Sequence, residues 1–232
     1  MSVGKIVGSN FASEVDSYWV GKEKDSPFSC PNVSLFRLIG GAVGSIKDKR
    51  VLEVGFAHGA DLMECKRRGA DVVGLDLNPN YVETVKTDSQ CDVRVFRAGT
   101  DAIPFDCKFD LIYSRDTICY LTDDELKQFF GQCANKMEPN GRLIVQFIET
   151  DLRLSSSAKK STQNFDIDFL KHYVPHQIHS ETNPIRFLVS DVVIEIAVSS
   201  NLLLVGSKRM LQSYDLNEEE LRVDKYLIFK KV

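Results

Sequence analysis

Two acidic residues and two glycines in the first half of the chain have the spacing of a nucleotide-binding site. Glu53 closes one apolar run and is followed by Gly55 and Gly59, and Asp76 ends the next apolar run. Glycine lets the backbone turn sharply and approach a ligand without a Cβ clash. A carboxylate at the end of the second strand can accept hydrogen bonds from both hydroxyls of a ribose. The pattern therefore predicts a strand, a glycine loop, a helix, a second strand and an acid that together hold an adenosine.

The spacing within the glycine loop favours one cofactor class over another. A dinucleotide fingerprint, G-x-G-x-x-G, laid over Gly55 meets Ala57 and Ala60 where it requires its second and third glycines. The form E-x-G-x-G-x-G instead finds Glu53, Gly55, Ala57 and Gly59, with a single conservative departure. This segment resembles motif I of the class I S-adenosylmethionine-dependent methyltransferases.

Three later segments resemble the same family in the same order. Residues 94–105 are similar to its third strand and adenine-side loop, and residues 109–121 to its F-D-L-V-x-S strand and the helix that follows. Residues 137–145 are similar to the L-K-P-G-G-x-L turn that leads into the fifth strand. One such match would be weak evidence, but four at the right spacing are strong evidence.

The resemblance implies a site for S-adenosylmethionine, whose product is S-adenosylhomocysteine. This cofactor has no phosphate, so the loop is expected to pack against its methionine part, with the acid before the loop helping to order it. In the adenine-side loop the family's acid position falls on Gly99, which moves the expected adenine contact to the next residues. The residues implied to bind the cofactor are Glu53, Gly55, Phe56, Ala57, Gly59, Asp76, Leu77, Thr100, Asp101, Ala102 and Ser114.

Catalytic candidates follow from position. Asp116 lies just beyond the fourth predicted strand, where related enzymes border the transferable methyl group. It could instead pair with Arg115 or cap the next helix. If the acceptor is a hydroxyl, a general base would help remove its proton, and His172 and His176 are further candidates for that role. Pro175 between them argues against a regular helix, and no carboxylate or cysteine supports a metal site there, so no metal is expected.

The two histidines belong to a long polar segment, residues 151–184, that follows the fifth predicted strand. A loop of this length in a compact domain is more often functional than a spacer, so we expect it to form a lid over the acceptor. Glu149, at the end of that strand, is expected to face the same cleft and is a candidate contact to the acceptor.

Two other features have competing interpretations. Tyr18 and Trp19 lie in an N-terminal segment that often covers the cofactor in related enzymes, but they could simply pack that segment onto the domain. His58 lies inside the glycine loop, at a position that usually contributes only backbone, so a structural role is favoured.

Strand-like and helix-like patterns alternate from residue 49 to residue 145, which predicts a parallel sheet with right-handed crossovers. Helices are expected over residues 33–43, 81–87, 123–137 and 190–199. Strand-like runs at 202–205 and 226–229 predict the family's closing antiparallel hairpin. The expected fold is a doubly wound α/β domain with a mostly parallel seven-stranded sheet. That single domain, residues 1–232, would comprise a cofactor-covering segment (1–48), a cofactor-binding core (49–150), the lid (151–184) and a C-terminal helix and hairpin (185–232).

Composition limits the partners of the chain. It has 232 residues, 43% of them apolar, and a formal net charge of −4, which gives no general attraction to nucleic acid. No apolar run is long enough to span a bilayer, and the six cysteines form no C-x-x-C pair, so we expect a cytoplasmic protein with reduced thiols. A small-molecule acceptor, such as a sugar or another metabolite, and a monomer or homodimer are expected. A non-catalytic S-adenosylmethionine-binding module and a nucleotide-dependent oxidoreductase remain alternatives.

Overall fold

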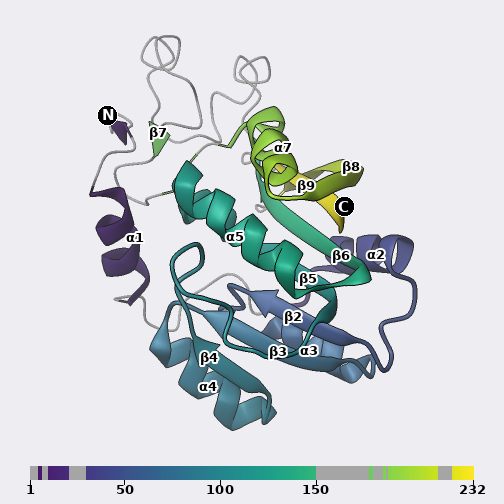
Figure 1. Cartoon of the computed structure of the whole chain (residues 1–232). Coiled ribbons are helices and arrows are strands. Elements are labelled where there is room, and N and C mark those ends of the chain that lie inside the picture. The colour runs from purple at the N-terminus through teal and green to yellow at the C-terminus, as the bar shows by residue number, and fades with distance from the viewer. Residues whose placement is uncertain are drawn as a thin grey trace.

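A seven-stranded sheet with helices on both faces forms the body of the molecule (Figure 1). The computed structural model describes residues 5–6, 10–20, 30–149, 178–179, 185–186, 188–213 and 221–232. The strands of this sheet are β2 (Arg50–Val54), β3 (Asp71–Asp76), β4 (Asp92–Val95), β5 (Phe109–Arg115), β6 (Met137–Ile148), β8 (Leu202–Ser213) and β9 (Leu221–Lys231). A separate pair, β1 (Lys5–Ile6) and β7 (Ile178–His179), is antiparallel.

The strand order is β4-β3-β2-β5-β6-β9-β8. The five strands from β4 to β6 run parallel, whereas β9 is inserted antiparallel between β6 and β8. This confirms the predicted mostly parallel sheet with a closing antiparallel hairpin. Both hairpin strands are longer than their apolar runs, because the β8–β9 ladder continues from Leu202 through Lys208 to Ser213, and hydrophobicity does not mark those polar residues.

Helices cover the two faces of the sheet because the strands alternate apolar side chains between them. In β2, Leu52 and Val54 belong to the core under α5 and α7, whereas Val51 belongs to the core under α2, α3 and α4. Figure 1 shows α5 crossing one face of the sheet, with α1 beside it. The helices are α1 (Phe11–Val20), α2 (Val33–Ala42), α3 (Ala60–Arg67), α4 (Pro79–Ser89), α5 (Asp123–Lys136) and α7 (Ser190–Ser199).

Local capping explains where several helices begin. The Thr122 hydroxyl accepts a hydrogen bond from the amide of Glu125 at 3.2 Å and so caps α5, with the Glu125 side chain completing a capping box. The carbonyl of the Asn32 side chain caps α2 in the same way. The helix expected over residues 190–199 is α7, but it has no side-chain cap, since Val189 precedes it and the Ser190 hydroxyl donates to Glu149.

Two elements differ from the sequence prediction. The helix expected over residues 81–87 is longer, because Asn78 caps α4 and Pro79 occupies its first turn, where a missing amide hydrogen costs nothing. The fourth predicted strand, β5, is followed by a short 3₁₀ helix, η1 (Ile118–Tyr120), rather than by the helix expected there. The longer helix after η1 is α5.

A glycine turn joins β2 to α3 and fixes the position of the functional site. Gly55 has φ +80°, and its amide donates to the carbonyl of Leu75 at 2.7 Å. A Cβ atom added to Gly55 would lie 1.9 Å from Oγ1 of Thr117, at the end of β5. Glycine is therefore required at position 55 because of the neighbouring Thr117 side chain and because of the positive φ angle. This requirement does not come only from the ligand space that the sequence pattern suggests.

We predict that Gly55→Ala destabilises the fold by roughly 2 kcal/mol or more, because alanine resists a positive φ and its Cβ would displace Thr117. Urea unfolding followed by circular dichroism measures the change. Gly131→Ala is the control, because Gly131 lies inside α5 with no atom within 4 Å of an added Cβ. That variant should be neutral or more stable, and equal stability of both variants would contradict the proposed constraint.

Candidate functional site

A cavity of about 340 Å³ opens at the carboxyl ends of the parallel strands. Its wall includes Gly55 after β2, Leu77 after β3, Phe96 after β4 and Asp116 after β5. Ligands of open α/β sheets collect at this edge, where the strand order reverses. The predicted residues Phe56, Ala57 and Asp76 also line the cavity.

Asp76 ties the glycine turn to the next helix. One oxygen, Oδ2, accepts from the amide of Ala57 at 2.8 Å, and Oδ1 accepts from the amide of Asn78 at 2.8 Å. Burial raises the pKa of Asp76 to about 6, against the lowering effect of these amides and that of Leu77. Each carboxylate oxygen has a second lone pair, so the side chain can accept further hydrogen bonds from a ligand.

Three predicted cofactor residues lie beneath the cavity and do not form its wall. Glu53 is 3% exposed, and the hydroxyl of Tyr113 donates to its Oε2 at 2.8 Å. Burial, together with the charge of Asp61, raises the pKa of Glu53 well above its ordinary value. Gly59 begins α3 with φ +72°, and Ser114 is buried within β5. These residues support the loop from below.

The adenine-side loop differs from the sequence expectation. Its contribution to the cavity wall is Phe96, Arg97 and Ala98. The predicted residues Thr100, Asp101 and Ala102 are exposed and lie outside the cavity wall, and Asp101 accepts from the amide of Arg97 at 2.7 Å. The reason is Gly99, whose φ of +76° turns the chain away, in a space where a Cβ would lie 2.4 Å from the carbonyl oxygen of Glu125.

The N-terminal helix α1 closes one side of the cavity. Val15, Tyr18 and Trp19 all line it, and the Trp19 ring meets the Tyr120 ring edge-to-face at 5.2 Å. The carbonyl of Trp19 accepts a hydrogen bond from the side-chain amide of Asn78 at 2.9 Å. The two interpretations of Tyr18 and Trp19 are therefore compatible, because the same residues pack α1 onto the domain and face the cavity.

At the other end of the cavity, Gln146 holds Asp116 in place. The backbone amide of Asp116 donates to the backbone carbonyl of Gln146 at 3.0 Å, and Nε2 of the Gln146 side chain donates to Oδ1 of Asp116 at 3.1 Å. Asp116 has φ +52°, which is unusual outside glycine. Nε of the neighbouring Arg115 lies 3.1 Å from Oδ2 of Asp61. Asp61 is thus an ionic partner of Arg115, and the residue at the cap position of η1 is Thr117.

Glu149 does not line the cavity, so its expected position in the cleft is wrong, whereas its contact with the acceptor stays a prediction. Its carboxylate accepts hydrogen bonds from Ser190 and Arg209, and Nζ of Lys225 lies 3.8 Å away. Burial raises the pKa of Glu149, but these bonds and charges outweigh that effect and lower it overall. Its neighbour Ile148 lines the cavity instead.

The predicted histidines lie in two different parts of the chain. His172 and His176 lie outside the described residues, but Ile148 and Ile185, on either side of that segment, line the cavity. The ring of His58 packs against the ring of Tyr81 with their centroids 4.8 Å apart, in keeping with a structural role.

Within the described part of the chain, no group of three or more histidine, cysteine or acidic side chains could hold a metal ion. No helix in that part is long and apolar enough to cross a membrane.

Sequence reasoning missed three functional side chains: Asn78, Arg97 and Gln146. The Asn-Pro pair at the start of α4 is an N-cap signal that could have identified Asn78. Gln146 is a polar residue between the apolar residues Leu143–Val145 and Phe147–Ile148 of β6, which is also a detectable signal. Arg97 carries no comparable signal, because its carboxylate partners, Asp16 and Glu125, come from distant parts of the chain.

Residues 51–141 match the family model of a methyltransferase domain. The chain is 26% identical over 103 residues to a phosphoethanolamine N-methyltransferase from Plasmodium falciparum, covering 43% of this chain and 39% of that protein. It is 32% identical over 74 residues to a magnesium-protoporphyrin O-methyltransferase from Rhodobacter capsulatus, covering 31% of this chain and 33% of that protein. The alignments thus span no more than about two fifths of these relatives.

Solved structures agree over nearly the whole chain. The crystal structure of magnesium protoporphyrin IX methyltransferase from Synechocystis, with bound S-adenosylmethionine, superimposes with a TM-score of 0.63. The match covers 98% of this chain and 100% of that one at 10% identity, so it establishes the fold. The match over residues 51–141 and the shared fold agree with the methyltransferase family that the four sequence segments predict. Residues 51–141 of this chain therefore belong to a methyltransferase domain, within a fold that the chain shares with an S-adenosylmethionine-bound methyltransferase.

Proposed function

We propose that this chain transfers a methyl group from S-adenosylmethionine to a small-molecule acceptor and releases S-adenosylhomocysteine. The observation that carries the proposal is the convergence of separate family-like segments on one cavity. The glycine turn at Gly55, the acid Asp76, the adenine-side residue Ala98 and Asp116 after β5 all line it.

The chemistry of the cavity fits this cofactor better than a dinucleotide. Asp76 offers acceptor positions for ribose hydroxyls, and Leu77 and Phe96 offer apolar surface for an adenine ring. The two arginines in the wall, Arg97 and Arg115, already have carboxylate partners. A cation that already has a carboxylate partner is a poor ligand for the pyrophosphate of a dinucleotide. A cofactor without phosphate does not require a cation in the wall.

When bound, S-adenosylmethionine supplies an activated methyl group, so the protein chiefly aligns the reactants and excludes water. We assign to Asp116 the acceptance of a proton from the acceptor, because it lines the cavity and Gln146 orients its carboxylate. The aromatic side chains of Trp19 and Tyr120 restrict access of water from the α1 side.

We further propose that residues 151–184 contribute the acceptor side of the site. Support comes from Ile148 and Ile185, which flank this segment and line the cavity. The backbone pairing of β1 with β7 also links the N-terminal segment to it. The two curated relatives methylate small molecules, one on nitrogen and one on oxygen, so an amine and a hydroxyl acceptor are both compatible. Cytoplasmic location, the lack of a nucleic-acid partner and a monomeric or dimeric state stay predictions from composition.

The first test of the proposal is binding. Asp76→Ala should weaken S-adenosylhomocysteine binding by on the order of 1.5–3 kcal/mol, because hydrogen bonds to a charged group are lost. Calorimetry measures the affinity, and Asp71→Ala is the matched control, because Asp71 is an exposed carboxylate at the other end of β3. Unchanged affinity in a folded Asp76→Ala protein would remove Asp76 from the site. Absence of binding by the wild type would overturn the proposed function.

The second test is the pH dependence of S-adenosylhomocysteine binding. Burial raises the pKa of Asp76 to about 6, so the carboxylate form dominates above that value and the neutral acid below it. Because the carboxylate is the better acceptor, affinity for S-adenosylhomocysteine should fall about tenfold between about pH 7 and about pH 5. Calorimetry at several pH values measures this, and Asp76→Ala should abolish the dependence. An affinity that rises on acidification would contradict the assignment.

The third test separates the candidate proton acceptors by turnover. S-adenosylhomocysteine formation would be measured with a panel of amine and hydroxyl metabolites, and the best acceptor used thereafter. Asp116→Asn should lower kcat by about 10²-fold or more while leaving cofactor affinity nearly unchanged. Replacing His172 and His176 by Ala should also impair turnover more than binding if residues 151–184 hold the acceptor. Wild-type turnover in the histidine double variant would leave Asp116 as the base.

A further inference from the structure

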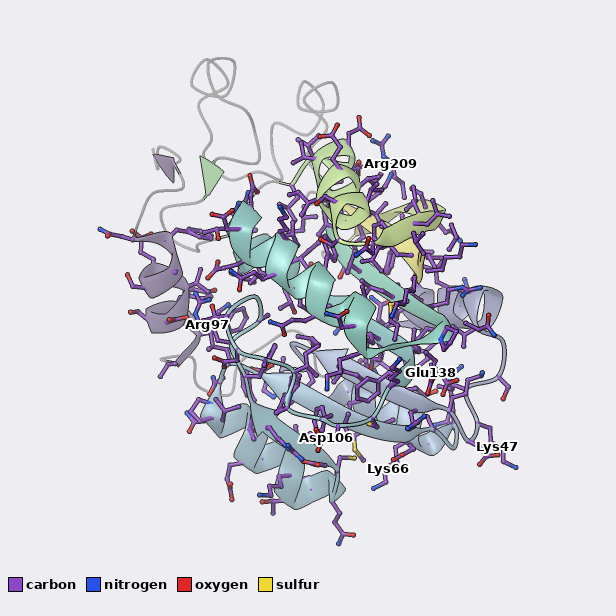
Figure 2. All side chains as sticks on the ribbon, in the orientation of Figure 1. Lys47, Lys66, Arg97, Asp106, Glu138 and Arg209 are labelled. Atoms are coloured by element: carbon purple, nitrogen blue, oxygen red, sulfur yellow. The ribbon has the colours of Figure 1, made fainter. Side chains whose placement is uncertain are left out.

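Arg97 lies where the cavity wall, α1 and α5 meet (Figure 2). Its Nε donates to Oδ1 of Asp16 on α1 at 2.8 Å, and a terminal nitrogen donates to the carbonyl oxygen of Ala12 at 3.3 Å. The other terminal nitrogen donates to Oε1 of Glu125 on α5 at 2.5 Å. One side chain therefore belongs to the wall of the site and also connects α1 to the body of the domain.

The helix that Arg97 holds covers the cavity. Val15, Tyr18 and Trp19 on α1 form part of the cavity wall, as do the glycine turn and Asp76. Near the end of the helix, the side-chain amide of Asn78 donates to the carbonyl of Trp19. The α1 helix is thus tied to the body by polar contacts at both ends, and a movement of α1 would open this side of the cavity.

The two partners of Arg97 differ in how easily they can be released. The Glu125 side chain is 14% exposed, and Glu125 is held in the capping box of α5. The Asp16 side chain is 42% exposed. When α1 moves, the Asp16 carboxylate can be rehydrated at little cost, whereas Arg97 stays paired with Glu125. The contact that breaks is therefore the one between Asp16 and Arg97.

Apolar packing supplies the rest of the attachment. Phe11 and Val15 are buried in the main core, so α1 would stay associated with the domain without the ion pair. The ion pair then changes how often the helix opens, and it has little effect on whether the protein folds. This distinction makes the contribution of Asp16 measurable separately from stability.

We propose that Asp16 is a positioning residue whose ion pair with Arg97 latches α1 over the bound cofactor and sets its residence time. This proposal rests on the proposed function, because the ligand is the cofactor of that site. Asp16 acts through Arg97, which forms part of the adenine-side wall, and does not itself line the cavity. Since the pair is partly exposed, salt should weaken the latch.

The test is the rate at which S-adenosylhomocysteine dissociates from the full-length chain, measured by surface plasmon resonance. Asp16→Asn should raise the rate about three- to fivefold, the range expected for a partly exposed ion pair. Asp16→Lys should raise it further by repelling Arg97, and Asp16→Glu should stay close to wild type. Trp19 is the single tryptophan of the chain, so its fluorescence reports on α1 directly.

Matched controls and salt separate the latch from general effects of charge. Asp88→Asn and Asp88→Lys make the same charge changes at an exposed position on α4 and should leave the rate unchanged. Raising NaCl from about 50 mM to about 500 mM should speed release from the wild type more than from Asp16→Asn. The melting temperatures of the Asp16 series should stay near that of the wild type. Identical release rates and salt responses across that series would overturn the latch, whereas failure of the wild type to bind would instead overturn the proposed function.

Discussion

A single buried carboxylate, Asp76, is the contact on which the site depends. A carboxylate at 8% exposure is costly to desolvate, and two backbone amides, those of Ala57 and Asn78, offset that cost. The same two bonds fix the glycine turn relative to the start of α4. Because Asn78 also bonds to the carbonyl of Trp19, the position of the N-terminal helix depends on the same group. The acid that we propose binds the ligand therefore also holds together the walls around the cavity.

The two arginines in the cavity wall form ion pairs with carboxylates of the protein. Arg97 contacts Asp16 and Glu125, and Arg115 contacts Asp61. These pairs join elements that are remote in sequence, so they organise the site instead of attracting phosphate. A cavity whose wall has two acids, Asp76 and Asp116, among largely apolar side chains suits a cofactor that carries its own positive charge at the sulfur. The chemistry then depends on alignment and on the exclusion of water.

Different parts of the fold build the two sides of the site. The proposed cofactor side is built by the connections after β2, β3 and β4, each of which contains backbone hydrogen bonds. The methyl-transfer side begins at Asp116, which Gln146 orients from the neighbouring strand β6. Beyond β6, Glu149 joins the end of that strand to α7 and the hairpin. This hydrogen-bonded base adjoins the segment in which we propose that the acceptor is recognised.

The sequence by itself determined the order of strands and helices, the glycine turn and the acid at Asp76, because each depends on local spacing along the chain. Tertiary structure decided which side chains reach the cavity. Glu53 has the right spacing but is buried against Tyr113, and the adenine-side wall ends at Ala98 because Gly99 turns the chain beside α5. Glu149 was predicted to face the acceptor, but its direction is set by Arg209 and other partners far along the chain. Burial and ion pairing between distant segments leave no periodic signal, which is why only the folded chain shows them.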